Sequence, residues 1–149
     1  SVTVHPRESA LPNSVRFNFG DKIALVGYDF DRRIGTPGET LRLTLYWEAL
    51  SPMEKSYTVF AHVLGEGTQM WAIGDGVPIN GLAPTFTWQP GQVVEDPHDL
   101  TIGETTPPGV YDVEVGLYLP KTGERLRLLA DDGFPLDTRV FLSKIRVSP

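Results

Sequence analysis

Residues 40–48 alternate strictly between apolar and polar side chains, and this pattern constrains the fold more than any other stretch of the chain. The apolar side chains are those of Leu41, Leu43, Leu45 and Trp47. Successive side chains of a strand point to opposite faces, so the pattern predicts a strand that is buried on one face only. Trp47 is therefore expected in a core, and Tyr46, on the opposite parity, is expected at the surface.

Similar segments recur along the chain, with turn residues between them. They span residues 15–19, 23–30, 57–64, 69–73, 93–100, 111–119, 124–129 and 140–147. Short strands at regular spacing, without a convincing amphipathic helix, are typical of all-β domains. We therefore predict a two-sheet, immunoglobulin-like β-sandwich with Greek-key connections and about eight or nine strands. Residues 40–48 and 111–119 are expected to form facing walls of its core.

Four positions carry further structural expectations. Gly27 is expected at a bulge or a close backbone approach, and Pro37-Gly38 at the centre of a type II turn. Pro97 cannot donate a ladder hydrogen bond, so its strand is expected at a sheet edge. Tyr111 follows a Pro-Pro-Gly-Val run, and immunoglobulin-like sandwiches often place a Tyr there whose hydroxyl bonds to nearby backbone.

Length and composition are those of one globular domain. The chain has 149 residues, of which 40% are hydrophobic and 21% charged, and a chain of this length buries roughly 68–70% of its unfolded surface. Residues 1–13 hold two prolines and few apolar side chains, so they are expected to be a leader or linker before a β-sandwich domain of residues 14–149. Residues 77–90 are expected to form an ordered loop. The apolar side chains expected to pin this loop to the body are Ile79, Leu82, Phe86 and Trp88.

The charge of the chain narrows the choice of partners. Thirteen Lys and Arg against 19 Asp and Glu give a formal net charge of −6, and the basic residues are scattered along the sequence. This balance disfavours nucleic acid and anionic lipid surfaces. The absence of Cys excludes disulfides and thiolate sites. No apolar run approaches the ~18 to 20 residues of a membrane span, so direct membrane insertion of this segment is not expected.

The histidines and carboxylates give no clear metal signature. His5, His62 and His98 lack the spacing of a zinc site, and His62 is expected to be a hydrogen-bonded histidine within a sheet. The densest polar cluster lies at residues 95–99. A solvated loop is the favoured interpretation of this cluster, and a calcium site that includes Asp96 and Asp99 is the alternative. We predict no cofactor and no metal site.

Catalytic signatures are likewise missing, which favours a non-catalytic domain. The sequence contains no Gly-x-Ser-x-Gly and no phosphate-binding Gly-rich loop before a helix. Aromatic side chains that could stack on a sugar ring are the candidates for ligand binding: Tyr46, Tyr118, Trp71 and Trp88. Trp71 and Trp88 have an alternative interpretation as core residues. Tyr46 and Tyr118, on the polar parity of their strands, are the better candidates for exposed rings.

Several phrases of the sequence form a familiar set. They are Phe19-Gly20 followed by Gly27-Tyr28-Asp29; Pro37-Gly38 followed by Leu45-Tyr46-Trp47; the strand of residues 57–64; Trp88 with Pro90-Gly91; and Pro108-Gly109 followed by Gly116-Leu117-Tyr118. This set resembles the C-terminal β-sandwich domain of bacterial membrane glycosyltransferases of the family 39, or dolichyl-phosphate-mannose, type. The similarity covers nearly the whole chain beyond residue 15.

The resemblance implies an accessory module on the extracytoplasmic face of a bacterial membrane, as a domain of a larger protein. In that family the transferase chemistry belongs to the membrane portion, so no catalytic residue is implied for this chain. The implied partners are a glycan or the parent membrane domain. A carbohydrate-binding module and an adhesion or assembly domain are the alternatives.

Overall fold

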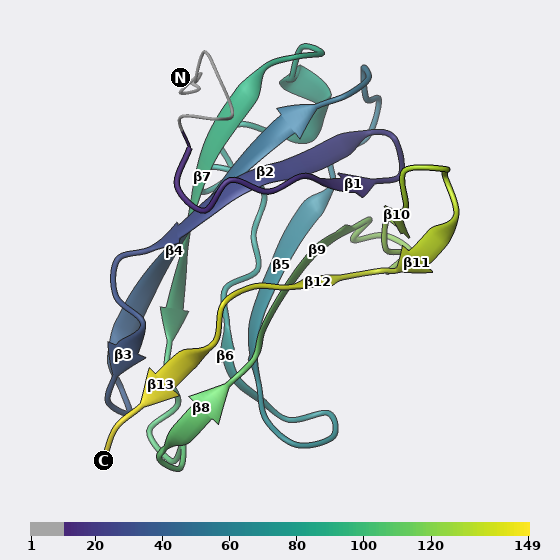
Figure 1. Cartoon of the computed structure of the whole chain (residues 1–149). Coiled ribbons are helices and arrows are strands. Elements are labelled where there is room, and N and C mark those ends of the chain that lie inside the picture. Colours follow the sequence, from purple (N-terminus) through teal and green to yellow (C-terminus); the bar gives the residue numbers. More distant parts are fainter. Residues whose placement is uncertain (1–10) are drawn as a thin grey trace.

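The computed structural model describes residues 11–149, and this part of the chain forms thirteen strands and the short 3-10 helix η2 (Thr85–Thr87) (Figure 1). The first sheet has the strand order β11 (Pro135–Asp137), β10 (Leu128–Leu129), β1 (Phe17–Phe19), β2 (Ile23–Phe30), β4 (Thr40–Ala49), β7 (Val93–Thr101). The second has the order β12 (Val140–Phe141), β9 (Val113–Tyr118), β5 (Thr58–Leu64), β6 (Met70–Ile73). The third has the order β3 (Ile34–Gly35), β13 (Ile145–Val147), β8 (Gly109–Tyr111). These packed sheets confirm the predicted all-β sandwich.

Between β4 and β7 the chain leaves the first sheet for the second and then returns to the first. The connection from β4 to β5 leaves the first sheet for the second, and the connection from β6 to β7 returns, so that β7 pairs antiparallel with β4. The last of four consecutive strands thus lies beside the first, which is the connectivity of a Greek key. β7 is an edge strand of its sheet, as Pro97 predicts.

The core lies between the first and second sheets. The apolar side chains of β4 at positions 41, 43, 45 and 47 are fully buried. They belong to one apolar cluster with alternate side chains of β5 and β9, including Val59, Ala61, Val113 and Val115. Fully burying one such side chain stabilises the fold by roughly 1.5–3 kcal/mol. The predicted inward face of residues 40–48, and its opposition to residues 111–119, are confirmed.

Residues 11–13 pack onto the outer face of the first sheet. Leu11 is buried in a second apolar cluster together with Tyr46. The N–H of Tyr28 donates to the carbonyl of Pro12 at 3.1 Å, and Nδ2 of Asn13 donates to the carbonyl of Tyr28 at 2.8 Å. These three residues, which we expected in the leader, are therefore part of the sandwich. The rest of the expected leader lies outside the described residues.

Gly27 has both properties expected of it. The register of β2 against β4 shifts between Leu25 and Gly27, which marks a bulge. A Cβ on Gly27 would lie 2.9 Å from the carbonyl oxygen of Pro12. The turn at Pro37-Gly38 is also as predicted, with Gly38 at φ +88° and a hydrogen bond from Glu39 N–H to Thr36 O of 3.0 Å.

The predicted strand of residues 140–147 is divided. β12 pairs with β9 in the second sheet, whereas β13 pairs with β8 and β3 in the third. Residues 111–119 are divided in the same way, between β8 and β9, because the chain passes from one sheet to another at Asp112. In the segment 124–129 the strand is confined to β10. The two divisions add two strands to the nine predicted segments, and β3 and β11, which the sequence did not predict, add two more.

Both apolar contacts and hydrogen bonds hold the loop of residues 77–90 to the body of the fold. Trp88 is buried as expected, whereas Leu82 and Phe86 are 74% and 54% exposed and do not pin the loop. The hydroxyl of Thr85 instead donates to the carbonyl of Lys55 at 2.7 Å and accepts the N–H of Tyr57 at 3.0 Å.

Candidate functional site

The four aromatic candidates do not gather into one platform. Tyr46 is only 8% exposed because residues 11–13 cover it, so the expectation of an exposed ring is wrong. Trp88 is 2% exposed, and its indole N–H donates to the carbonyl of Ala83 at 3.0 Å. Tyr118 and Trp71 are both partly exposed. They lie toward opposite ends of the second sheet, since Tyr118 pairs with the first residue of β5 and β6 pairs with its last residues.

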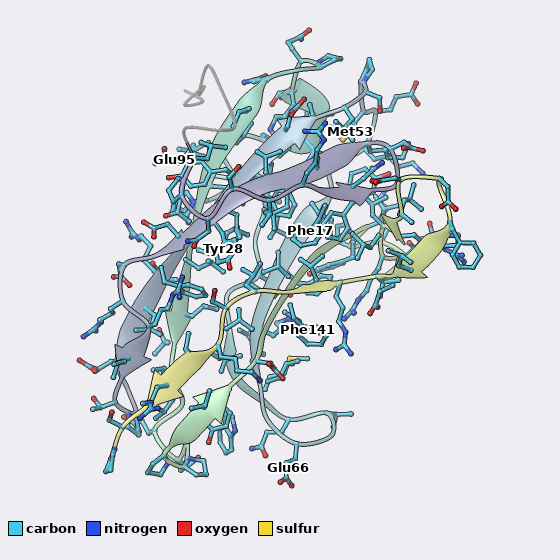
Figure 2. All side chains as sticks on the ribbon, viewed as in Figure 1. Phe17, Tyr28, Met53, Glu66, Glu95 and Phe141 are labelled. Carbon is cyan, nitrogen blue, oxygen red and sulfur yellow. The ribbon has the colours of Figure 1, made fainter. Side chains whose placement is uncertain are left out.

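Trp71 lines a hollow of about 600 Å³ at the β5–β6 hairpin end of the sandwich. Polar and aromatic side chains share this lining: Glu66, Gln69, Tyr111 and Asp112. Glu66 lies at the tip of the hairpin and points away from the body (Figure 2). We call this hollow, with Trp71 at its wall, the Trp71 hollow.

The walls of the Trp71 hollow are fixed by local contacts. A Cβ on Gly65 would lie 2.8 Å from Nε1 of Trp71, so only glycine lets the hairpin backbone approach the indole this closely. The hydroxyl of Tyr111 donates to the carbonyl of Pro107 at 2.6 Å, which confirms the backbone bond expected for this tyrosine. The carboxylate of Asp112 accepts from Nζ of Lys144 at 2.7 Å. Half-buried aromatic rings beside polar side chains are typical of small-ligand sites.

The polar cluster at residues 95–99 is not a solvated loop. It forms the middle of β7, where Asp96 is fully buried. One carboxylate oxygen of Asp96 accepts the indole N–H of Trp47 at 3.1 Å and lies 2.6 Å from Nε2 of His98, and the other accepts the N–H of Ile79 at 2.8 Å. Asp99 instead is exposed and pairs with Arg42 at 3.1 Å. Within residues 11–149, no group of three or more His, Asp and Glu side chains is placed to hold a metal ion.

A second polar cluster surrounds the buried side chain of His62, which is hydrogen-bonded within a sheet as expected. Its Nδ1 lies 2.7 Å from Oε2 of Glu114, and its Nε2 lies 2.9 Å from Oδ1 of Asp75. The other oxygen of Glu114 accepts from Arg139 at 2.7 Å. Phe60 stacks on the imidazole with ring centroids 5.3 Å apart. We call His62, Asp75, Glu114 and Arg139 the His62 cluster.

Burial and charge oppose one another within both polar clusters. Burial lowers the pKa of His62, but its bonds to Asp75 and Glu114 outweigh this and leave the pKa raised. The pKa of His98 is raised in the same way, because the carboxylate of Asp96 outweighs burial. Burial raises the pKa of Glu114, but Arg139 and His62 outweigh it and leave the pKa lowered. The folded protein therefore favours the charged forms of His62, His98 and Glu114.

We expect the free energy of unfolding to fall as the pH rises above about 6.5. His62 and His98 bind a proton more tightly in the folded state, so their contribution is complete below the unfolded pKa and is lost as the pH passes their raised folded pKa values. Glu114 acts in the opposite sense, and its contribution is lost as the pH falls through its lowered pKa. Urea denaturation at a series of pH values measures both the loss of stability at alkaline pH and the loss at acidic pH. An unchanged loss of stability at alkaline pH in a variant carrying His62→Gln and His98→Gln would contradict the assignment.

Sequence reasoning did not find the His62 cluster. His62 and Glu114 lie 52 positions apart and meet only because β5 and β9 pair in a register that places them opposite one another. Arg139 arrives from the segment before β12. Each residue type is ordinary at its place in the sequence, so no local signal marks the cluster.

No known protein family and no curated protein matches this sequence. Within the described residues, no helix has the length and apolar character needed to cross a membrane.

Proposed function

We propose that this chain is a non-catalytic β-sandwich module of a bacterial membrane glycosyltransferase-like protein, and that it binds glycan on the extracytoplasmic side of the membrane. The observation that carries the binding proposal is the Trp71 hollow, where a partly exposed indole lies beside Glu66, Gln69 and Asp112. An aromatic face packs against the apolar face of a sugar ring. Carboxylate and amide oxygens accept hydrogen bonds from sugar hydroxyls.

The link to a membrane glycosyltransferase is supported by the motif resemblance. Many residues of those motifs have structural roles in the sandwich: Trp47 anchors the core, Gly27 forms the bulge and Gly38 makes the type II turn. The proposed identity of the domain therefore rests on the motif resemblance alone, and the proposal that it binds a glycan rests on the Trp71 hollow. Fusion of a compartment-sensitive reporter to the full-length protein tests the location, and activity of the reporter on the cytoplasmic side would contradict it.

Trp71→Ala is expected to weaken the binding of neutral oligosaccharides about tenfold or more, since buried aromatic contacts dominate such sites. NMR titration of the labelled domain measures both the affinity and the place of binding. Met70→Ala is the matched control, because Met70 precedes Trp71 on β6, is 39% exposed and does not line the hollow. The proposal fails if the natural domain shows no chemical-shift change with any neutral sugar at millimolar concentration.

A second candidate function is docking to a protein partner, as in an adhesion or assembly domain. β11 lies at the edge of the first sheet, and Phe134 and Leu136 are 66% and 60% exposed there. Edge strands with exposed apolar side chains bind other chains by strand addition. Docking would be favoured if Leu136→Ser abolishes the binding of a protein partner and the natural domain binds no sugar at the Trp71 hollow.

A further inference from the structure

Five basic side chains gather at one end of the sandwich, although the basic residues are scattered along the sequence. They are Lys22, Lys55, Lys121, Arg125 and Arg127. They come from the β1–β2 turn, the β4–β5 connection and the β9–β10 connection, which meet at the same end of the fold (Figure 1). This is the end opposite the Trp71 hollow, because β5 begins here and ends there.

None of these five cations forms an ion pair with another residue of the described range 11–149. By contrast, five cations elsewhere on the described surface are paired with carboxylates: Arg16, Arg32, Arg42, Arg139 and Lys144. Of the other cations in residues 11–149, Arg33 and Arg146 also lack an ion pair, so the five make up most of the unpaired positive charge of the described surface. Such a cluster raises the local concentration of anionic ligands despite the negative net charge.

The five cations line three adjoining hollows of about 310, 350 and 400 Å³. All three hollows share Leu119, and Lys22 and Lys55 each line two of them. The hollows are therefore parts of one groove, which we call the basic groove. Two carboxylates, Glu54 and Glu124, also line it.

Arg125 is the best positioned of the five cations. Its guanidinium lies 4.2 Å from the centroid of the Phe60 ring, and that ring is itself 1% exposed. Stacking on a fixed ring restrains the guanidinium and leaves its N–H donors available in its plane. A restrained guanidinium is suited to a carboxylate or phosphate, which accepts two parallel hydrogen bonds from it.

We propose that the basic groove binds a polysaccharide that carries carboxylate or phosphate groups. The anionic groups bind the five cations, and sugar hydroxyls donate to Glu54 and Glu124. Cations distributed along three hollows suit a chain with repeated anionic groups better than a single small anion. This site is separate from the Trp71 hollow and goes beyond the function proposed above.

The lining of the groove favours a sugar chain over the other polyanions. Its one aromatic side chain, Tyr57, is 6% exposed, so the groove has no surface on which nucleic-acid bases stack. None of the exposed large apolar side chains of the described residues lines it, so it offers nothing to insert into a lipid bilayer. The hydroxyls of Ser56 and Thr122, together with the two carboxylates, match sugar hydroxyls instead.

The test is an NMR titration of the labelled domain with a galacturonic acid hexamer, which supplies carboxylates, and separately with a glycerol phosphate oligomer, which supplies phosphates. Shifts with either probe are expected at residues 22, 55 and 119–127, with an affinity that falls as salt rises to about 0.15 M. Arg125→Gln is expected to weaken binding about tenfold. Lys55→Gln and Lys121→Gln are each expected to weaken it roughly two- to fivefold.

Matched variants separate this site from general charge effects. Arg42→Gln removes a cation that is already paired with Asp99 on another part of the surface, and it is expected to leave binding unchanged. Met70→Ala, on β6 and outside both the basic groove and the Trp71 hollow, is also expected to leave it unchanged. Lys55 and Lys121 are both exposed, so a variant lacking both remains folded and decides the question if Arg125→Gln does not fold.

Four outcomes would overturn the proposal. The first is the absence of shifts with either probe at millimolar concentration, and the second is binding that the double lysine variant leaves intact. The third is inorganic phosphate binding as tightly as the oligomers, which would mean a site for a small anion. The fourth is tighter binding to single-stranded DNA or to phosphatidylglycerol vesicles than to either sugar probe.

Discussion

Replacing Asp96 with Ala is expected to lower the free energy of unfolding by about 3–5 kcal/mol. The carboxylate is fully buried and accepts the N–H groups of Trp47 and Ile79, while it also holds the imidazole of His98. The substitution leaves two donors and a buried imidazole without their acceptor, and each unpaired buried polar group costs free energy. Urea denaturation at neutral pH measures the change.

Asp99→Ala is the matched control for Asp96. Asp99 lies three positions further along the same strand, but its side chain is 56% exposed and pairs with Arg42 at the surface. Exposed ion pairs contribute about 0–1 kcal/mol, so this variant is expected to be nearly as stable as the natural protein. Equal losses in the two variants would show that Asp96 has no special role in holding β7 to the core.

Glu114→Ala is expected to cost a similar amount, about 3–5 kcal/mol. Glu114 is 2% exposed, and its two oxygens bond to His62 at 2.7 Å and to Arg139 at 2.7 Å. Without the carboxylate, His62 keeps only Asp75 to favour its charged form, while burial continues to oppose it. The variant should therefore also show a shallower loss of stability at alkaline pH.

Asp112→Ala serves as the control for Glu114. Asp112 lies on the same segment and also pairs with a cation, Lys144, but both partners of that pair are exposed. Its loss is expected to cost less than about 1 kcal/mol. If Glu114→Ala were as stable as Asp112→Ala near pH 6, where the His62 cluster is charged, the cluster would be no more than a surface contact.

The sequence predicted the core strands well, because burial on one face of a strand leaves a period of two. The prediction of burial from this pattern failed where the outer face of a sheet is covered as well as its inner face. Tyr46 has the parity of a surface residue, yet Leu11 packs on the same face, some 35 positions earlier in the chain. Phe60 and His62 are buried on the outer face of the second sheet in a similar way, since Arg125 stacks on Phe60, and Asp75 and Glu114 flank His62.

The candidate sites were harder to predict than the fold. Asp96 belongs to a polar run that is typical of a loop, and only the register of β7 against β4 shows that its carboxylate meets the indole of Trp47. Trp71 was identified as a candidate by residue type alone. The basic groove needed the topology, because the connections that carry Lys22, Lys55 and Arg125 meet only when the strand ends are placed in space.

The pairing of β3 with β13 has a consequence for how the molecule reaches its folded state. Ile34 pairs in parallel with Arg146, on the order of 100 residues later in the chain. During synthesis, β3 leaves the ribosome long before its partner exists, and the entropy of closing so long a loop delays the pairing further. The pairing of Asn18 in β1 with Leu129 in β10 spans a similar separation, so we expect the C-terminal segment to join both the first and the third sheet after β2, β4 and β7 have paired.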